Sequence, residues 1–260
     1  MLPPAERRPT GQYRLQVLGG WHLTAGGLPC PVPLRSQRLI ALLAVAGPLP
    51  RPVIGGRLWP EGSEDRALDS VRVAIHHVCR DLPGLLSRHG ASVALSTEVE
   101  VDLDLARAAL SEDTMPESRP GILDDPELLP GWYEEWVLAA QDRLRTQRLR
   151  GHTGRAQRLL DTGDLHGAVE WASRSLDLDP LDEWSLEVLV RAHCRLGSVG
   201  AARRAITVLR GGLQREFGQF SSPLLEQLER LATHPPVPRT PVQAREPAVG
   251  RADGIHPGGR

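Results

Sequence analysis

The residue pattern of this chain changes once, across a stretch rich in proline and acidic residues at positions 111–130. Before it, short alternating segments are mixed with helical stripes, and after it the pattern is purely helical. Such a stretch between two patterned halves is typical of a linker, and 260 residues suit two modest domains. We expect a flexible lead at residues 1–11 and a mixed α+β domain at 12–110. A linker at 111–130 leads to an all-α domain at 131–233, and residues 234–260 are expected to form a disordered tail.

The second half contains an internal repeat with a period of 34 residues. Gly163-Asp164-Leu165 recurs as Gly197-Ser198-Val199, and Ala168 corresponds to Ala202 at the same offset. A helix–turn–helix repeat of this length is typical of tetratricopeptide proteins, in which small residues let paired helices approach closely. The sequence predicts a small solenoid whose concave face binds a protein or peptide, preceded by a long helix with a break at Gly151–Gly154.

The first half begins with a strand, because apolar and polar residues alternate over residues 13–17. Glycine-rich turns follow, and they predict a small antiparallel sheet at the N-terminus. A core helix then starts with Ser36 as its cap and ends at Gly47-Pro48. A second, short helix fits residues 52–58.

A third helix is predicted from about Asp65 to Leu82, because its apolar residues recur at intervals of 3, 4, 3 and 4. This stripe consists of Leu68, Val71, Ile75, Val78 and Leu82. The opposite side carries Asp69, Arg72, Val73, His76 and Arg80, flanked by Arg66, Ser70 and His77. The alternating segments ASVALS (91–96) and VEVDLDL (99–105) then predict a β-hairpin, followed by a short helix at DLARAAL.

Three helices followed at once by a hairpin are the layout of a winged helix-turn-helix domain, in which the third helix enters a DNA groove. We expect Arg72 and His76 to read base edges. Arg66, Arg80 and Arg88 are expected to contact phosphates. These charges alone are equally typical of an ordinary solvent-facing surface, so the prediction depends on the layout. The candidate DNA-binding residues are Arg66, Ser70, Arg72, Val73, His76, His77, Arg80 and Arg88.

Composition and motifs argue against several other classes of protein. Acidic and basic residues nearly cancel, 32 against 31, so the chain is not a uniformly basic coat protein for nucleic acid. The absence of lysine excludes a P-loop, and no zinc-protease, serine-hydrolase or His/Cys metal motif occurs. The three cysteines lie far apart and no long apolar run occurs, so we expect no disulfide scaffold, no membrane contact and a cytoplasmic protein. The sequence thus predicts a protein that is not an enzyme and uses no cofactor or metal.

Longer segments carry a family resemblance. PVPLRSQRLIALLAV, RLWPEGSEDRALDSVRVAIHHV and LSTEVEVDLDL resemble the OmpR-type DNA-binding domain of the Streptomyces antibiotic regulatory proteins. The stretch from LLPGWYEEWVLAAQDRL to LRGGLQREFG is similar to the bacterial transcriptional activation domain of that family. The resemblance covers roughly residues 12–233. It implies a pathway-specific activator on the nucleoid that binds direct repeats at promoters of antibiotic gene clusters.

The resemblance also implies partners and residue roles. Family members bind double-stranded DNA as head-to-tail homodimers and recruit the RNA polymerase holoenzyme, and their short forms need no nucleotide. By this resemblance, Arg72, His76, His77 and Arg80 fall in the recognition helix. The loop that contacts the polymerase corresponds to Glu61, Gly62, Ser63, Glu64 and Asp65.

A protein-interaction adaptor is the alternative function. In such an adaptor the repeat domain does the binding, and the winged helix has weak or no affinity for DNA. Asp69, the adjacent His76 and His77, and the near-neutral net charge favour this alternative. The salt dependence of binding separates the two, because only a protein that contacts phosphates loses affinity steeply with added salt.

Overall fold

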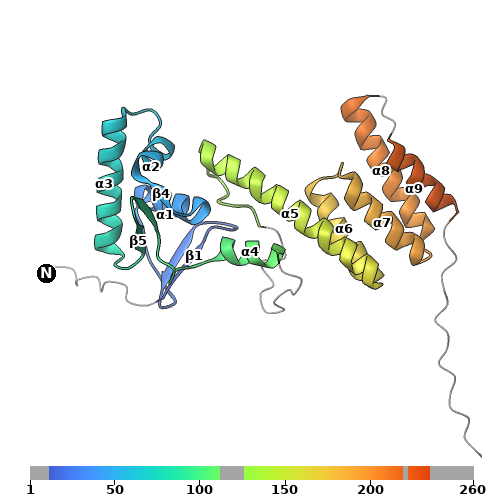
Figure 1. Ribbon diagram of the computed structural model, residues 1–260, viewed down its shortest axis with the longest axis horizontal. Helices are drawn as coiled ribbons and strands as arrows, with labels where there is room; N and C mark the ends of the chain where they lie inside the picture. Colours follow the sequence, from blue (N-terminus) through green and yellow to red (C-terminus); the bar gives the residue numbers. More distant parts are fainter. Residues whose placement is uncertain (1–11, 112–125, 219–221, 235–260) are drawn as a thin grey trace, which may run out of the picture.

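The computed structural model describes residues 12–111, 126–218 and 222–234. Within them, a part that mixes strands and helices precedes a part built of helices (Figure 1). The predicted order, α+β followed by all-α, is therefore confirmed. The predicted lead, residues 1–11, and the predicted tail from residue 235 onward lie outside the described residues.

The first sheet has the strand order β3-β2-β1-β7. β1 (Tyr13–Gln16) pairs antiparallel with β2 (His22–Ala25), which pairs in the same sense with β3 (Leu28–Pro29). Side chains of β1 alternate between the core and solvent, as predicted. β7 (Glu100–Val101) runs parallel to β1 on its other side, a pairing that the local pattern did not predict.

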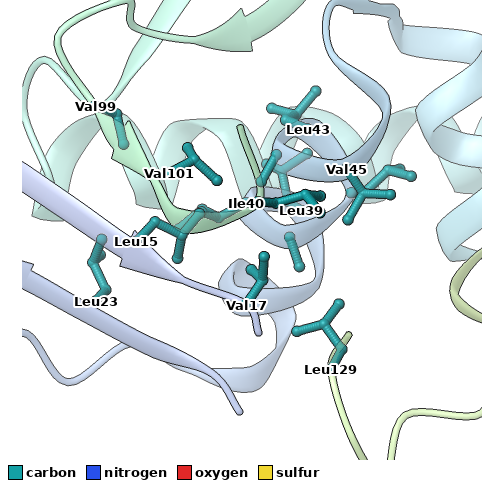
Figure 2. Close-up of a cluster of buried hydrophobic side chains, with 14 of the residues drawn as sticks. Leu15, Val17, Leu23, Leu39, Ile40, Leu43, Val45, Val99, Val101 and Leu129 are labelled. Atoms are coloured by element: carbon teal, nitrogen blue, oxygen red, sulfur yellow. The ribbon is translucent and has the colours of Figure 1, made fainter. Parts of the chain in front are cut away.

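Helix α1 (Leu34–Ala46) is central to the first hydrophobic core. Every residue from Leu39 to Val45 is buried, and side chains of β1, β7 and Leu129 meet this helix (Figure 2). Ser36 was expected to cap the helix, and this prediction is wrong. The helix begins earlier, because the amide of Ser36 already donates a hydrogen bond to the carbonyl of Pro33, at 2.9 Å.

Two helices follow the short strand β4 (Leu49–Pro50) and complete the helix-turn-helix. They are α2 (Arg51–Leu58) and α3 (Glu64–Asp81), and both agree closely with the predicted helices. Buried residues of α3, such as Val71 and Val78, belong to the predicted apolar stripe. The outward side of α3 is therefore the predicted polar side.

The hairpin after α3 differs from the predicted one. β5 (Leu86–His89) pairs with β6 (Ser92–Leu95), and β6 also pairs with β4. The predicted pairing of residues 91–96 with 99–105 is wrong, because Val99 and Val101 are buried in the core beside β1. The chain then enters α4 (Asp102–Ser111), which confirms the short helix predicted there.

The stretch expected to be a linker, residues 111–130, differs at its C-terminal end. Residues 112–125 lie outside the described residues. Leu128 and Leu129 are buried, and the amide of Leu129 donates to the carbonyl of Val17 at 2.8 Å. The end of this stretch is therefore part of the first core, because its two leucines fill space beside β1.

The helical part begins with α5 (Glu135–Thr162), whose first half packs on the first core through Trp136, Val137, Ala140 and Leu144. The predicted break at Gly151–Gly154 is absent, since α5 is one continuous helix. Gly151 instead allows close contact with α4, because a Cβ there would lie 2.9 Å from Leu110 Cδ2. One continuous helix thus joins the two parts of the chain (Figure 1).

Four further helices pack in sequence after α5. They are α6 (Leu165–Leu178), α7 (Glu183–Arg195), α8 (Val199–Phe217) and α9 (Pro223–Thr233).

The predicted 34-residue repeat is confirmed at structurally equivalent sites. Gly163 and Gly197 both have positive φ angles, 92° and 74°, at helix ends. Ala168 and Ala202 are both fully buried. Small side chains at these two positions let successive helices approach, which explains why the sequence repeats there.

Candidate nucleic-acid interface

The outward side of α3 is the largest part of the candidate interface. Its exposed side chains are Arg66, Asp69, Arg72, Val73, His76 and Arg80, and Ser70 and His77 are half-buried. A helix turns about 100° per residue, so residues 66, 73 and 80 follow almost one line. The structure thus brings the predicted helix residues together on one accessible surface, and their contacts with DNA stay a prediction.

Ion pairs within α3 engage two of these arginines. Arg72 Nη1 lies 2.7 Å from Asp69 Oδ1, and Arg80 Nε lies 2.7 Å from Asp81 Oδ1. The hydrogen bond from Arg80 lowers the pKa of the Asp81 carboxyl. Exposed ion pairs are weak, about 0–1 kcal/mol, so both guanidinium groups are able to exchange these partners for groups of a DNA duplex. Among the described residues, no ion pair engages Arg66.

Contacts with α2 and α1 on its buried side hold α3 in position. A Cβ at Gly55 would lie 3.3 Å from Ala67 Cβ, so the missing side chain lets α2 pack closely on α3. Arg35 of α1 donates to the carbonyl of Ser70 at 3.3 Å and stacks over Trp59, 5.2 Å from the ring centroid. Sequence reasoning missed Arg35, because nothing in its local pattern indicates a contact with a residue of α3.

The β5–β6 hairpin supplies Arg88. Its side chain is exposed on β5, and a turn at Gly90, with φ of 60°, leads into β6. The hairpin is held near the end of α3, because Leu85 is buried and the Tyr13 hydroxyl donates to the carbonyl of Pro83 at 3.2 Å. Arg88 is therefore an exposed arginine on the hairpin that directly follows α3, which is the place of a wing in this kind of domain.

The residues expected to contact RNA polymerase lie between α2 and α3. Glu61, Gly62, Ser63, Glu64 and Asp65 are all exposed. Glu64 and Asp65 belong to the first turn of α3 rather than to a loop. Two carboxylates at a helix N-terminus are stabilised by the helix dipole. This acidic corner, residues 61–65, directly precedes Arg66 in the chain. It therefore adjoins the outward side of α3 and leaves the arginines there exposed.

The helical part carries a groove between α5 and α7 with a volume of about 670 Å³. Leu149 and Val188 line it, and Trp184 stands at its edge with 75% of its surface exposed. The Thr153 hydroxyl lies in its wall and shares hydrogen bonds with Ser175 and Ser185 at 2.8 and 2.7 Å. The adaptor hypothesis requires a binding surface on the helical part, and this groove is a candidate for it.

In the described parts of the chain, no group of three or more His, Cys, Asp or Glu side chains is arranged to hold a metal ion. Over the same ranges, every helix is too short or too polar to cross a membrane.

Residues 121–231 match the family model of the bacterial transcriptional activator domain. The fold is similar to that of a solved structure, "Mycobacterium tuberculosis EmbR in complex with low affinity phosphopeptide", with 17% sequence identity and a TM-score of 0.59. The match covers 85% of this chain and 65% of that chain. None of the curated proteins compared with the chain is similar to it in sequence.

The fold class predicted from the sequence, a winged helix-turn-helix domain followed by a tetratricopeptide-like domain, is confirmed by this likeness and by the elements themselves. The activator-domain match covers the helical part and begins shortly before it. Residues 121–231 are thus similar to the bacterial transcriptional activator domain, and the fold of the chain as a whole is similar to that of the EmbR structure.

Proposed function

We propose that this protein activates transcription by binding double-stranded DNA through α3 and the β5–β6 hairpin. The observation that supports this most strongly is the outward side of α3, where Arg66, Arg72 and Arg80 are exposed, and the hairpin that follows α3 carries a further exposed arginine, Arg88. In this arrangement α3 lies in the major groove, with Arg72 and His76 at base edges. Arg66, Arg80 and Arg88 neutralise phosphates.

The resemblance to the Streptomyces antibiotic regulatory proteins supports finer proposals about the DNA site and about the partners of this protein. We propose that the protein binds direct repeats at promoters of an antibiotic gene cluster as a head-to-tail homodimer on the nucleoid. We also propose that it recruits the RNA polymerase holoenzyme through the acidic corner at residues 61–65. The exposure of that corner beside the DNA-binding surface supports this, because a polymerase bound next to the site would meet it first.

The experiment starts by selecting DNA sites for the full chain from a random-sequence duplex library. Fluorescence anisotropy then measures affinity for the selected site and for scrambled DNA. We expect Arg72→Ala to lower specific affinity by about 1–3 kcal/mol. The matched control is Arg203→Ala on α8, an exposed arginine of the helical part. Equal affinities of the Arg72→Ala variant and the wild type for the selected site would contradict the proposed orientation of α3.

Two further measurements test the partners. Light scattering of the complex is expected to give two protomers on a pair of direct repeats and one on a single repeat. In transcription with the purified holoenzyme, Glu61→Ala with Glu64→Ala is expected to reduce activation while DNA affinity is kept. Parallel loss of both properties would mean that the corner acts through DNA binding alone.

The adaptor hypothesis rests on the groove between α5 and α7 and on exposed Trp184. It predicts that Trp184→Ala abolishes function while α3 variants have no effect. It also predicts no steep loss of affinity between about 50 and 200 mM salt.

A further inference from the structure

Val73 occupies an unusual position on α3. It is 44% exposed and points away from the core, since buried Val71, Ala74 and Val78 lie on the other side of the helix. Arg66 and Arg80 stand seven residues before and after it, about 10.5 Å away along the axis and on nearly the same line. Val73 is therefore the apolar centre of a surface that is otherwise polar and charged.

Folding does not account for a valine here. The side chain adds little to the core, because almost half of it stays in contact with water. As a β-branched residue, valine also has a lower helix propensity than arginine, glutamate or glutamine. The position is thus neither required for packing nor favourable for the helix, and its side chain is accessible to a ligand that approaches the outward side of α3.

We infer that Val73 contacts the 5-methyl group of a thymine in the major groove and makes α3 select thymine at that position. This inference rests on the proposed DNA-binding function. Thymine alone among the four bases presents a methyl group in the major groove, where apolar side chains contact it. Arg66 and Arg80 are spaced to reach phosphates toward opposite edges of a groove about 12 Å wide, which places Val73 over the base pairs between them.

The surroundings of Val73 fit a base pair that contains thymine. One turn away on either side, Asp69 and His76 offer polar groups, and Asp69 already holds the Arg72 guanidinium at 2.7 Å. A polar side chain at residue 73 would compete for the same hydrogen-bonding groups. A valine instead excludes water from the 5-methyl group of the thymine. Burying one methyl-sized group is expected to raise affinity about three- to fivefold.

The test uses the full chain and the DNA site selected from random sequences. Each thymine of the site is replaced in turn by deoxyuridine, which removes only the 5-methyl group. At one of these positions, we expect the replacement of thymine by uracil to lower the affinity of the wild-type protein for the duplex three- to fivefold. Val73→Ala is expected to bind the thymine and uracil duplexes equally, at the lower affinity. Val73→Thr, which keeps one methyl group, is expected to retain part of the preference.

Val208→Ala is the matched control, because Val208 is an exposed valine, 67% accessible, on α8 of the helical part. It is expected to keep the full preference for thymine. Circular dichroism establishes that each variant is folded. A selected site at which Val73→Ala discriminates thymine from uracil as the wild type does would overturn this inference and leave the proposed function intact. Failure to select any DNA sequence would overturn the proposed function and the inference with it.

Discussion

The guanidinium group of Arg72 lies 2.7 Å from the carboxylate of Asp69, one turn earlier on α3, and both side chains are 70% exposed. In the free protein this pair holds one candidate base-reading side chain along the helix axis. On DNA, the same carboxylate would approach the phosphates and repel them. Asp69 therefore opposes the proposed function in two ways, by occupying Arg72 and by its own charge.

Asp69→Asn is expected to tighten DNA binding about three- to tenfold at low salt, because it releases Arg72 and removes a negative charge near the phosphates. Anisotropy titrations at about 50 and 200 mM salt measure the effect and its screening. Glu170→Gln is the matched control, since Glu170 pairs with Arg174 in α6 and the variant changes net charge equally. Equal tightening by both variants would attribute the gain to net charge rather than to the position of Asp69.

Removing the arginine of the hairpin tests the wing. Arg88→Ala is expected to weaken binding about equally on selected and scrambled DNA, because a phosphate contact carries no sequence information. The slope of log affinity against log salt is expected to fall by about one. Arg230→Ala, at an exposed arginine of α9, is the control and should leave the slope unchanged. A loss confined to the selected site would instead assign Arg88 to base reading.

The elements predicted correctly from the sequence are those whose burial follows a local period. The apolar stripe of α3 recurs every three or four residues because one side of that helix packs on α1 and α2. Ala168 and Ala202 recur at 34 residues because each lies where two helices approach closely. The polar side of α3 was predictable for the same reason, because it consists of the residues that do not belong to the apolar stripe.

The predictions that failed depend on contacts between distant segments. LSRH has no clear alternation, yet it forms β5 because Leu85 and Leu86 anchor it to the core and its backbone pairs with β6. Leu128 and Leu129 stand in a proline- and acid-rich stretch, so only the fold reveals that they are buried. Gly151 suggested a helix break, whereas its missing side chain makes room for Leu110.

Two adjacent glycines of α2 test how the helix-turn-helix is held together. A Cβ at Gly56 would have no atom within 4 Å, so Gly56→Ala is expected to stabilise the protein by about 0.5–1 kcal/mol. A Cβ at Gly55 would lie 3.3 Å from Ala67 Cβ, so Gly55→Ala has to displace α2 from α3. We expect it to destabilise the protein by about 1–3 kcal/mol and to weaken DNA binding. Urea unfolding measures the free energies, and opposite signs for the two variants are the required outcome.

The last prediction concerns His193, in the final turn of α7. Burial lowers the pKa of its imidazole, and the nearby positive charge of Arg204 on α8 lowers it further. Its Nδ1 is buried and makes no hydrogen bond to any other described residue. Below pH 6.5 the unfolded chain therefore binds a proton more readily than the folded chain does. The stability that neutral His193 contributes is fully present above about pH 6.5 and is lost as pH falls through the lower pKa of the folded state.

His193→Gln is accordingly expected to flatten the fall in the free energy of unfolding between about pH 7 and 5, because glutamine does not titrate. Arg204→Ala should make that fall shallower, since it removes the second cause of the lowered pKa. His166→Gln, on the exposed side of α6, is the matched control and should keep the wild-type pH dependence. Urea unfolding at a series of pH values makes the comparison. An unchanged slope in the His193→Gln variant would mean that other groups carry the acid sensitivity, and that the packing of α7 against α8 tolerates a charged imidazole.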